Sequence, residues 1–205
     1  MTSVDLSATI ASRICHDLVS PIGAIVNGVD LIREIGGGDV QDELGMISQS
    51  ADRASSLLQF YRIAFGASDP EATAIARSTL YDMASRLITT PRVVVEWSDL
   101  DGPALTRSEA RLLFQMLLCA KLAVAMRGVV LIETGTDQTA PITVTVETGE
   151  GAPINNDLTR HYDLALAAEV PARMVEFPLT ALSAQEMGLT LDVQAEGPRL
   201  TMTVR

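Results

Sequence analysis

The chain has 205 residues with 26 acidic side chains against 15 Lys and Arg, so its formal net charge is −11. This acidic balance argues against nucleic-acid binding, which needs a basic surface to neutralise phosphates. No basic-then-apolar leader opens the sequence, and no apolar run reaches the ~20 residues that span a bilayer, so we expect a cytoplasmic protein with no membrane partner. The length has room for one large domain or two small ones.

The first predicted element is a long amphipathic helix from about Val4 to Ile35, with apolar residues every three or four positions. A glycine-rich turn at residues 36–39 follows, and then a second helix with an apolar seam that is typical of coiled coils. The seam residues are Leu44, Ile47, Ala51, Ala54, Leu58, Tyr61 and Phe65. The sequence therefore predicts an antiparallel helical hairpin over residues 1–67. Two such hairpins would cover their apolar flanks by pairing into a dimeric four-helix bundle, and the alternative is packing against the C-terminal half of the same chain.

The first helix contains the segment Ser12-Arg13-Ile14-Cys15-His16-Asp17-Leu18-Val19-Ser20-Pro21. The residues three and four positions from His16 are mostly polar, so the imidazole should face solvent. Gly23 lies one turn further along the same face and lets a partner approach the backbone. Pro21 has no N–H for the carbonyl of Asp17, so the helix should bend there, at a cost of ~3 kcal/mol. Something other than folding is expected to retain this arrangement.

A neutral imidazole is a competent nucleophile toward phosphorus, because its unperturbed pKa of about 6.5 leaves a ring nitrogen free near neutral pH. Asp17 could orient the ring or accept a proton. The alternative interpretation is an ordinary surface histidine on a bundle helix. The two cysteines, Cys15 and Cys119, lie in largely apolar helical patterns, so we expect buried thiols and neither a disulfide framework nor a zinc site.

After a break at residues 66–70, helices and strands alternate over residues 71–205, which predicts a two-layer α/β sandwich. Overall the fold class is α+β. The expected helices cover about 71–88, 108–126, 158–168 and 179–187, and the expected strands cover 93–97, 129–134, 142–147, 189–194 and 200–204.

The run His16-Asp17-Leu18-Val19-Ser20-Pro21 resembles the H-box of sensor histidine kinases. The longer stretch from Arg13 to Gly28 is similar to the ChpT-type histidine phosphotransferases of alphaproteobacteria. That resemblance implies a homodimer that passes phosphate from the receiver domain of a CckA-like hybrid kinase to CtrA-like and CpdR-like response regulators.

The element order of the second unit is similar to the ATP-binding domain of histidine kinases, but the nucleotide chemistry is missing. Cys119 stands where the resemblance places a magnesium-binding Asn, and a thiol is a poor ligand for magnesium. Residues 178–185 contain no glycine to cradle phosphates. The nearest match to the adenine motif, residues 147–151, is more simply a tight turn after a strand. We therefore expect no ATP binding and no cofactor on this chain, with magnesium on the partner receiver domain.

On this resemblance, His16 attacks an aspartyl phosphate, Asp17 positions the imidazole, and Arg13 steadies phosphate oxygens. The expected docking residues are Ser12, Ser20, Gly23 and Asn27 on the first helix, with Gln49, Asp52, Arg53 and Ser56 on the second. Two other functions stay open. One is an ATP-using histidine kinase with an atypical nucleotide site, and the other is a non-catalytic dimeric scaffold.

Overall fold

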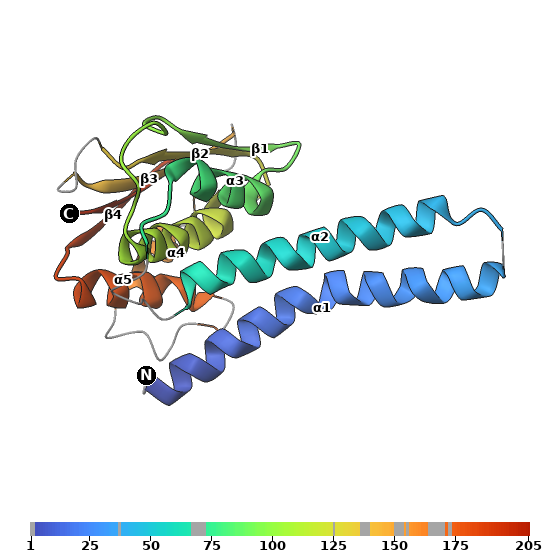
Figure 1. Ribbon diagram of the computed structural model, residues 1–205. Coiled ribbons are helices and arrows are strands. Elements are labelled where there is room, and N and C mark those ends of the chain that lie inside the picture. The colour runs from blue at the N-terminus through green and yellow to red at the C-terminus, as the bar shows by residue number, and fades with distance from the viewer. Residues whose placement is uncertain are drawn as a thin grey trace.

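The computed structural model describes residues 3–36, 38–66, 73–124, 126–135, 140–149, 154, 156–163, 171 and 174–205. Two long antiparallel helices, α1 (Ser3–Ile35) and α2 (Gln41–Ala64), form a hairpin that projects from an α/β body (Figure 1). The helix α1 bends part-way along its length, and it contains Pro21. In the described part of the chain, no helix is both long and apolar enough to cross a membrane.

The hairpin helices approach closely at Gly28, which is buried in the interface between them. A Cβ atom at this position would lie 2.7 Å from Cγ1 of Ile47 on α2. The glycine therefore lets the two backbones come together at this level.

Among its described residues, the body contains four helical segments and a mixed five-stranded sheet in the order β1-β2-β3-β5-β4. The strands β1 and β2 are parallel, and the remaining neighbours are antiparallel. The helices are α3 (Arg77–Ile88), α4 (Arg107–Val124), the 3-10 helix η1 (Asn156–Tyr162) and α5 (Glu176–Glu186). The strands are β1 (Val93–Trp97), β2 (Gly128–Glu133), β3 (Ile142–Thr148), β4 (Leu191–Glu196) and β5 (Arg199–Val204).

Helices α3, α4 and α5 lie on one side of the sheet (Figure 1). Strands β1, β2, β3 and β5 alternate buried with more exposed residues. This alternation is expected of a sheet with one face packed on helices and the other facing solvent. The predicted α+β fold class and two-layer sandwich are confirmed.

The base of the hairpin is built into the core of the body. The ring of Phe60 on α2 stacks on Phe114 of α4 with centroids 4.3 Å apart. Gln115 donates a hydrogen bond from Nε2 to the carbonyl oxygen of Ala64 at 2.8 Å. The hairpin thus packs partly on its own chain, which is the alternative that the sequence left open.

On the sides that the body does not cover, the hairpin leaves large apolar side chains exposed on both helices. They are Val19, Ile22, Val26, Leu31 and Ile35 on α1 and Leu44, Met46 and Leu58 on α2. Packing within one chain therefore does not cover the apolar surface that the periodicity predicts.

Three predicted helices differ from the structure. The helix expected from Leu179 is α5, which begins at Glu176. The helix expected from Glu71 begins at Arg77, because Ile75 instead forms an isolated bridge with Leu105; residues 71–72 lie outside the described residues. The helix expected over 158–168 is a 3-10 helix that ends at Tyr162, and residues 164–168 lie outside the described part. All five strands lie within two residues of their predicted positions.

Candidate functional site: an exposed histidine held by a buried network

His16 lies on the outer face of α1, and 81% of its side chain is exposed, as the polar neighbours predict. Its Nδ1 atom is 3.0 Å from Oδ1 of Asp17. When Nδ1 carries the proton and donates to this carboxylate, Nε2 has a free lone pair. The arrangement therefore offers an accessible nucleophilic nitrogen with a fixed partner on the opposite side of the ring.

The second oxygen of Asp17 is bound from the inside of the hairpin. Tyr61 on α2 donates a hydrogen bond from its hydroxyl to Oδ2 of Asp17, and Nη2 of Arg13 lies 3.4 Å from the same oxygen. Burial acts to raise the pKa of the Asp17 carboxyl, but the hydrogen bonds from Tyr61 and His16 and the charges of Arg13 and Lys121 outweigh it. The net effect lowers the pKa of Asp17, so the carboxylate stays ionised near neutral pH.

Arg13 joins this network to the body of the protein. Its Nε atom is 2.9 Å from Oε1 of Glu176, a fully buried residue in the first turn of α5. The contact is an ion pair without hydrogen-bond alignment, since neither Glu176 oxygen has a hydrogen-bond partner. Burial raises the pKa of Glu176, and the Arg13 charge opposes that rise. In this structure the Arg13 guanidinium therefore contacts two carboxylates.

The predicted docking residues separate into two groups. Ser12 and Asn27 are exposed, and Gly23 has open space where a side chain would project. Ser20 instead lines a cleft of about 840 Å³ between α1, α2 and the end of α3.

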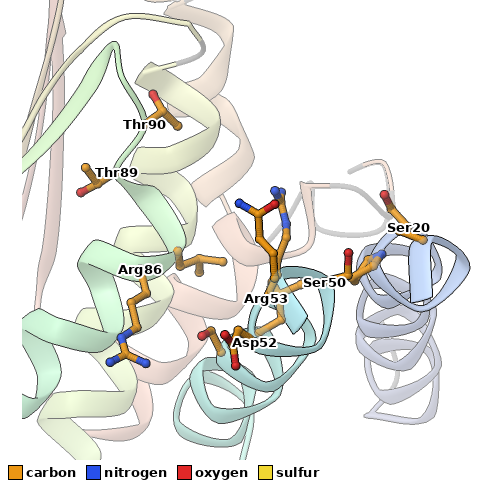
Figure 2. A pocket seen from close by; sticks show the side chains of 13 residues that line it. Ser20, Ser50, Asp52, Arg53, Arg86, Thr89 and Thr90 are labelled. Atoms are coloured by element: carbon orange, nitrogen blue, oxygen red, sulfur yellow. The ribbon is translucent and has the colours of Figure 1, made fainter. Parts of the chain in front are cut away.

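The cleft brings Ser20 together with the four predicted residues of α2, and the body adds a third wall. Figure 2 shows Ser20 on α1, Asp52 and Arg53 on α2, and Arg86 on α3. The remaining polar lining residues are Gln49, Ser50, Ser56, Thr89 and Thr90. The contribution of α3 could not be predicted from helical periodicity, because it depends on how the body packs on the hairpin.

Cys119 is fully buried, and its Sγ atom lies 3.5 Å from Oγ1 of Thr180 on α5. Burial raises the pKa of this thiol to about 12. The prediction of a buried thiol was wrong for Cys15, which is exposed because it lies on the outer side of α1 beside His16.

The two segments that were compared with nucleotide-binding motifs are residues 178–185 and residues 147–151. Residues 178–185 belong to α5, and Glu147 at the end of β3 forms an ion pair with Arg199 on β5. Residues 150–151 of the glycine-rich match lie outside the described residues.

Sequence reasoning missed Tyr61 and Glu176 as parts of the site. Tyr61 occupies an apolar seam position of α2, so the pattern predicts only packing for it. Glu176 precedes the expected start of its helix and had no signal at all. Tyr61 contacts Asp17 and Glu176 contacts Arg13, and in each pair the two residues are at least 44 positions apart in the sequence.

An exposed imidazole oriented by a carboxylate on a two-helix hairpin, joined to this α/β body, is the arrangement of a phosphotransferase that works through phosphohistidine. Comparisons with known proteins give the same class. Residues 77–199 match the family described as "Histidine phosphotransferase C-terminal domain". The chain belongs to this histidine phosphotransferase family and is a phosphotransferase of phosphorelay signalling.

Two relatives cover nearly the whole chain. The chain is 32% identical over 196 residues to the protein phosphotransferase ChpT of Brucella abortus (strain 2308), which covers 95% of this chain and 92% of the relative. A solved structure of a bacterial phosphotransferase is 29% identical and superposes with a TM-score of 0.76 over 100% of this chain and 98% of that one. The similarity therefore includes the hairpin as well as the body.

Proposed function

We propose that His16 carries the phosphoryl group between receiver-domain aspartates. The observation that carries this proposal is the exposed imidazole whose Nδ1 is held by Asp17, which leaves Nε2 as the nucleophile. The lone pair of Nε2 attacks the phosphorus of an aspartyl phosphate in line. A P–N bond forms as the P–O bond breaks, and the receiver aspartate leaves as a free carboxylate.

Asp17 stabilises the positive charge that develops on the ring as the P–N bond forms, while the Nδ1 proton stays between the ring and the carboxylate. No external base is needed, because the neutral imidazole enters the reaction with Nε2 unprotonated. Transfer to a second receiver is the same step in reverse. Arg13 contacts Glu176 and holds the carboxylate of Asp17 in place. It lies about one turn of helix from His16, which carries the phosphoryl group.

The receiver domain docks over His16 and the cleft beside it. Ser20 is four residues from His16, about 6 Å along the helix, so a domain seated on the histidine covers the cleft entrance. Arg53 and Arg86 offer positive charge there, next to the acidic Asp52. Ser12, Gly23 and Asn27 extend the docking face along α1. The partners are a CckA-like hybrid kinase upstream and CtrA-like and CpdR-like response regulators downstream.

Two copies of the chain pair through their hairpins in this proposal. The exposed apolar residues Val19, Ile22 and Val26 recur at helical spacing on α1, and Leu44, Ala51 and Leu58 recur every seven residues on α2. Such stripes are typical of helices that pack in a bundle.

The proposed reaction uses no ATP, and the magnesium ion belongs to the receiver domain. This rests on the burial of Cys119 against Thr180, which leaves a poor magnesium ligand without access to a nucleotide. The unpaired cysteines, one of them exposed, suit a reducing compartment and support a cytoplasmic site of action.

The test incubates the wild-type protein and His16→Ala separately with a receiver domain carrying labelled phosphate, and then with labelled ATP. We expect the label to move from the receiver to the wild type alone, with none taken from ATP. His161→Ala is the matched control, because the His161 ring meets Phe177 of α5 edge-on in the body, and its loss should not affect transfer. Label taken from ATP would identify a histidine kinase, and no label from either donor would favour a scaffold.

A further inference from the structure

Tyr61 is the one neutral hydrogen-bond donor that contacts the carboxylate of Asp17 from another helix in the described part of the chain. Its side chain is 3% exposed, and it enters the site from α2 through the interior of the hairpin. Oδ1 of Asp17 faces His16, while Oδ2 faces Tyr61. The two contacts thus use opposite oxygens of one carboxylate.

The surroundings of Tyr61 fix where its hydroxyl points. The ring stacks on Phe65 with centroids 5.3 Å apart, and it meets Phe60 edge-on. Burial, together with the hydrogen bond to Asp17, raises the pKa of Tyr61 well above its ordinary value, so the hydroxyl remains a donor. A carboxylate alone rotates broadly about its terminal torsion, and an anchored donor on one oxygen removes that freedom.

We propose that Tyr61 is a positioning residue for phosphoryl transfer, which acts through Asp17 by fixing the carboxylate that orients the His16 ring. This inference rests on the proposed function. Tyr61 does not touch the reacting atoms. It keeps Oδ1 available to Nδ1, and this holds the ring in the tautomer whose Nε2 lone pair faces the receiver.

The purely structural alternative is that Tyr61 only fills the core with its ring. Tyr61→Phe separates the two roles, because it keeps the aromatic packing and removes the hydroxyl. Tyr81→Phe is the matched control, since the half-buried Tyr81 on α3 donates its hydroxyl to the carbonyl oxygen of Val95 at 3.3 Å in the body.

The first readout is the tautomer of His16, measured by long-range 1H–15N NMR on the labelled full-length protein at a pH where the ring is neutral. The chain has two histidines, so His161 serves as an internal reference. We expect the Nδ1–H form in the wild type and in Tyr81→Phe, and a mixture of both forms in Tyr61→Phe. An unchanged tautomer in Tyr61→Phe overturns the inference, whether or not the protein transfers phosphate.

The second readout is rapid-quench transfer from a phosphorylated receiver domain of the cognate hybrid kinase. Tyr61→Phe should lower the rate constant at saturating receiver by about tenfold, which is the scale of one lost hydrogen bond to a charged group, and leave the half-saturating concentration unchanged. A change in the half-saturating concentration alone would point to docking and would contradict a positioning role.

A double-mutant cycle decides whether Tyr61 acts through Asp17. The variant Tyr61→Phe/Asp17→Ala should be no slower than Asp17→Ala, because the hydroxyl has no side-chain acceptor to position at residue 17 once the carboxylate is removed. Additive losses would show that Tyr61 acts by another route. If the wild type accepts no phosphate at all, the proposed function fails, while the tautomer measurement still tests the role of Tyr61.

Discussion

At the scale of single residues, the site depends on how one carboxylate is shared. Asp17 accepts from His16 on one oxygen and from Tyr61 on the other, and Arg13 adds a charge next to the second oxygen. These contacts favour the ionised form over the protonated one, and they outweigh the burial that opposes it. The same interactions that orient the histidine therefore stabilise the folded chain as long as Asp17 is charged.

The pH dependence of stability should carry the signature of Asp17. Its folded-state pKa is lowered from 3.8, so its contribution is present above about pH 4 and is lost as the pH falls through the folded value. We expect the free energy of unfolding of the wild type to fall more steeply below pH 4 than that of Asp17→Asn. Urea unfolding at pH values from 7 to 3 measures this, and parallel curves for the two proteins would contradict the prediction.

At the scale of elements, α1 combines local features that work against a regular helix. Pro21 removes one backbone hydrogen bond, and Gly23 sits in the helix interior with nothing within 4 Å of the point where a Cβ atom would lie. Glycine in a helix interior is unfavourable relative to alanine, so packing does not explain its presence here. On the proposed function, access for a docked receiver domain explains it.

The variant Gly23→Ala should therefore gain stability and lose activity. We expect an increase of up to about 1 kcal/mol in the free energy of unfolding from helix propensity. Transfer from a receiver should become slower, because the methyl group lies on the proposed docking face. Gly45→Ala on α2 is the control, since it also has open space and should gain stability without slowing transfer. A Gly23→Ala protein with normal transfer rates would remove Gly23 from the docking face.

At the scale of the whole molecule, one part of the hairpin is packed into the core of the body and another part has exposed apolar side chains. Near the body, Phe60 and Ala64 belong to the common core. In contrast, Val26 on α1 and Leu58 on the uncovered side of α2 are each more than 50% exposed. A monomer would leave this apolar surface in water at a free-energy cost. In the proposed dimer, a second copy covers this surface, while the side chain of His16 remains exposed on α1 in the single chain.

We therefore expect a dimer, and a charged side chain among the apolar residues Leu44, Ala51 and Leu58 of α2 should disrupt it. Light scattering coupled to size-exclusion chromatography should give twice the 21.9 kDa chain mass for the wild type and the single-chain mass for Leu58→Glu. Met126→Glu is the control, because Met126 is an exposed apolar residue of the body and should leave the dimer intact. A monomeric wild type would contradict the proposal.

Periodicity predicted most of this architecture from the sequence, because the hairpin and the strands are determined by local spacing of apolar residues. The strand Val93–Trp97 matches its predicted bounds. The start of α3 was misplaced because the pairing of Ile75 with Leu105 is a contact between distant segments. Prediction of the site had the same limit, because local patterns do not show contacts between distant segments. The local motif identified His16 and Asp17, but Tyr61 and Glu176 join them only after the chain has folded.

The ion pair between Arg13 and Glu176 has a consequence for how the protein can be divided. Arg13 contacts Asp17 on its own helix and Glu176 at the start of α5. The body is therefore linked to His16 through three consecutive contacts, from Glu176 to Arg13, from Arg13 to Asp17 and from Asp17 to His16. A fragment that ends at residue 66 would keep the nucleophile and lose Glu176 and Lys121, two of the charges around its supporting carboxylate. On the proposed function, the α/β body is thus a second part of the phosphotransfer site, and we do not expect the isolated hairpin to act as an independent catalytic module.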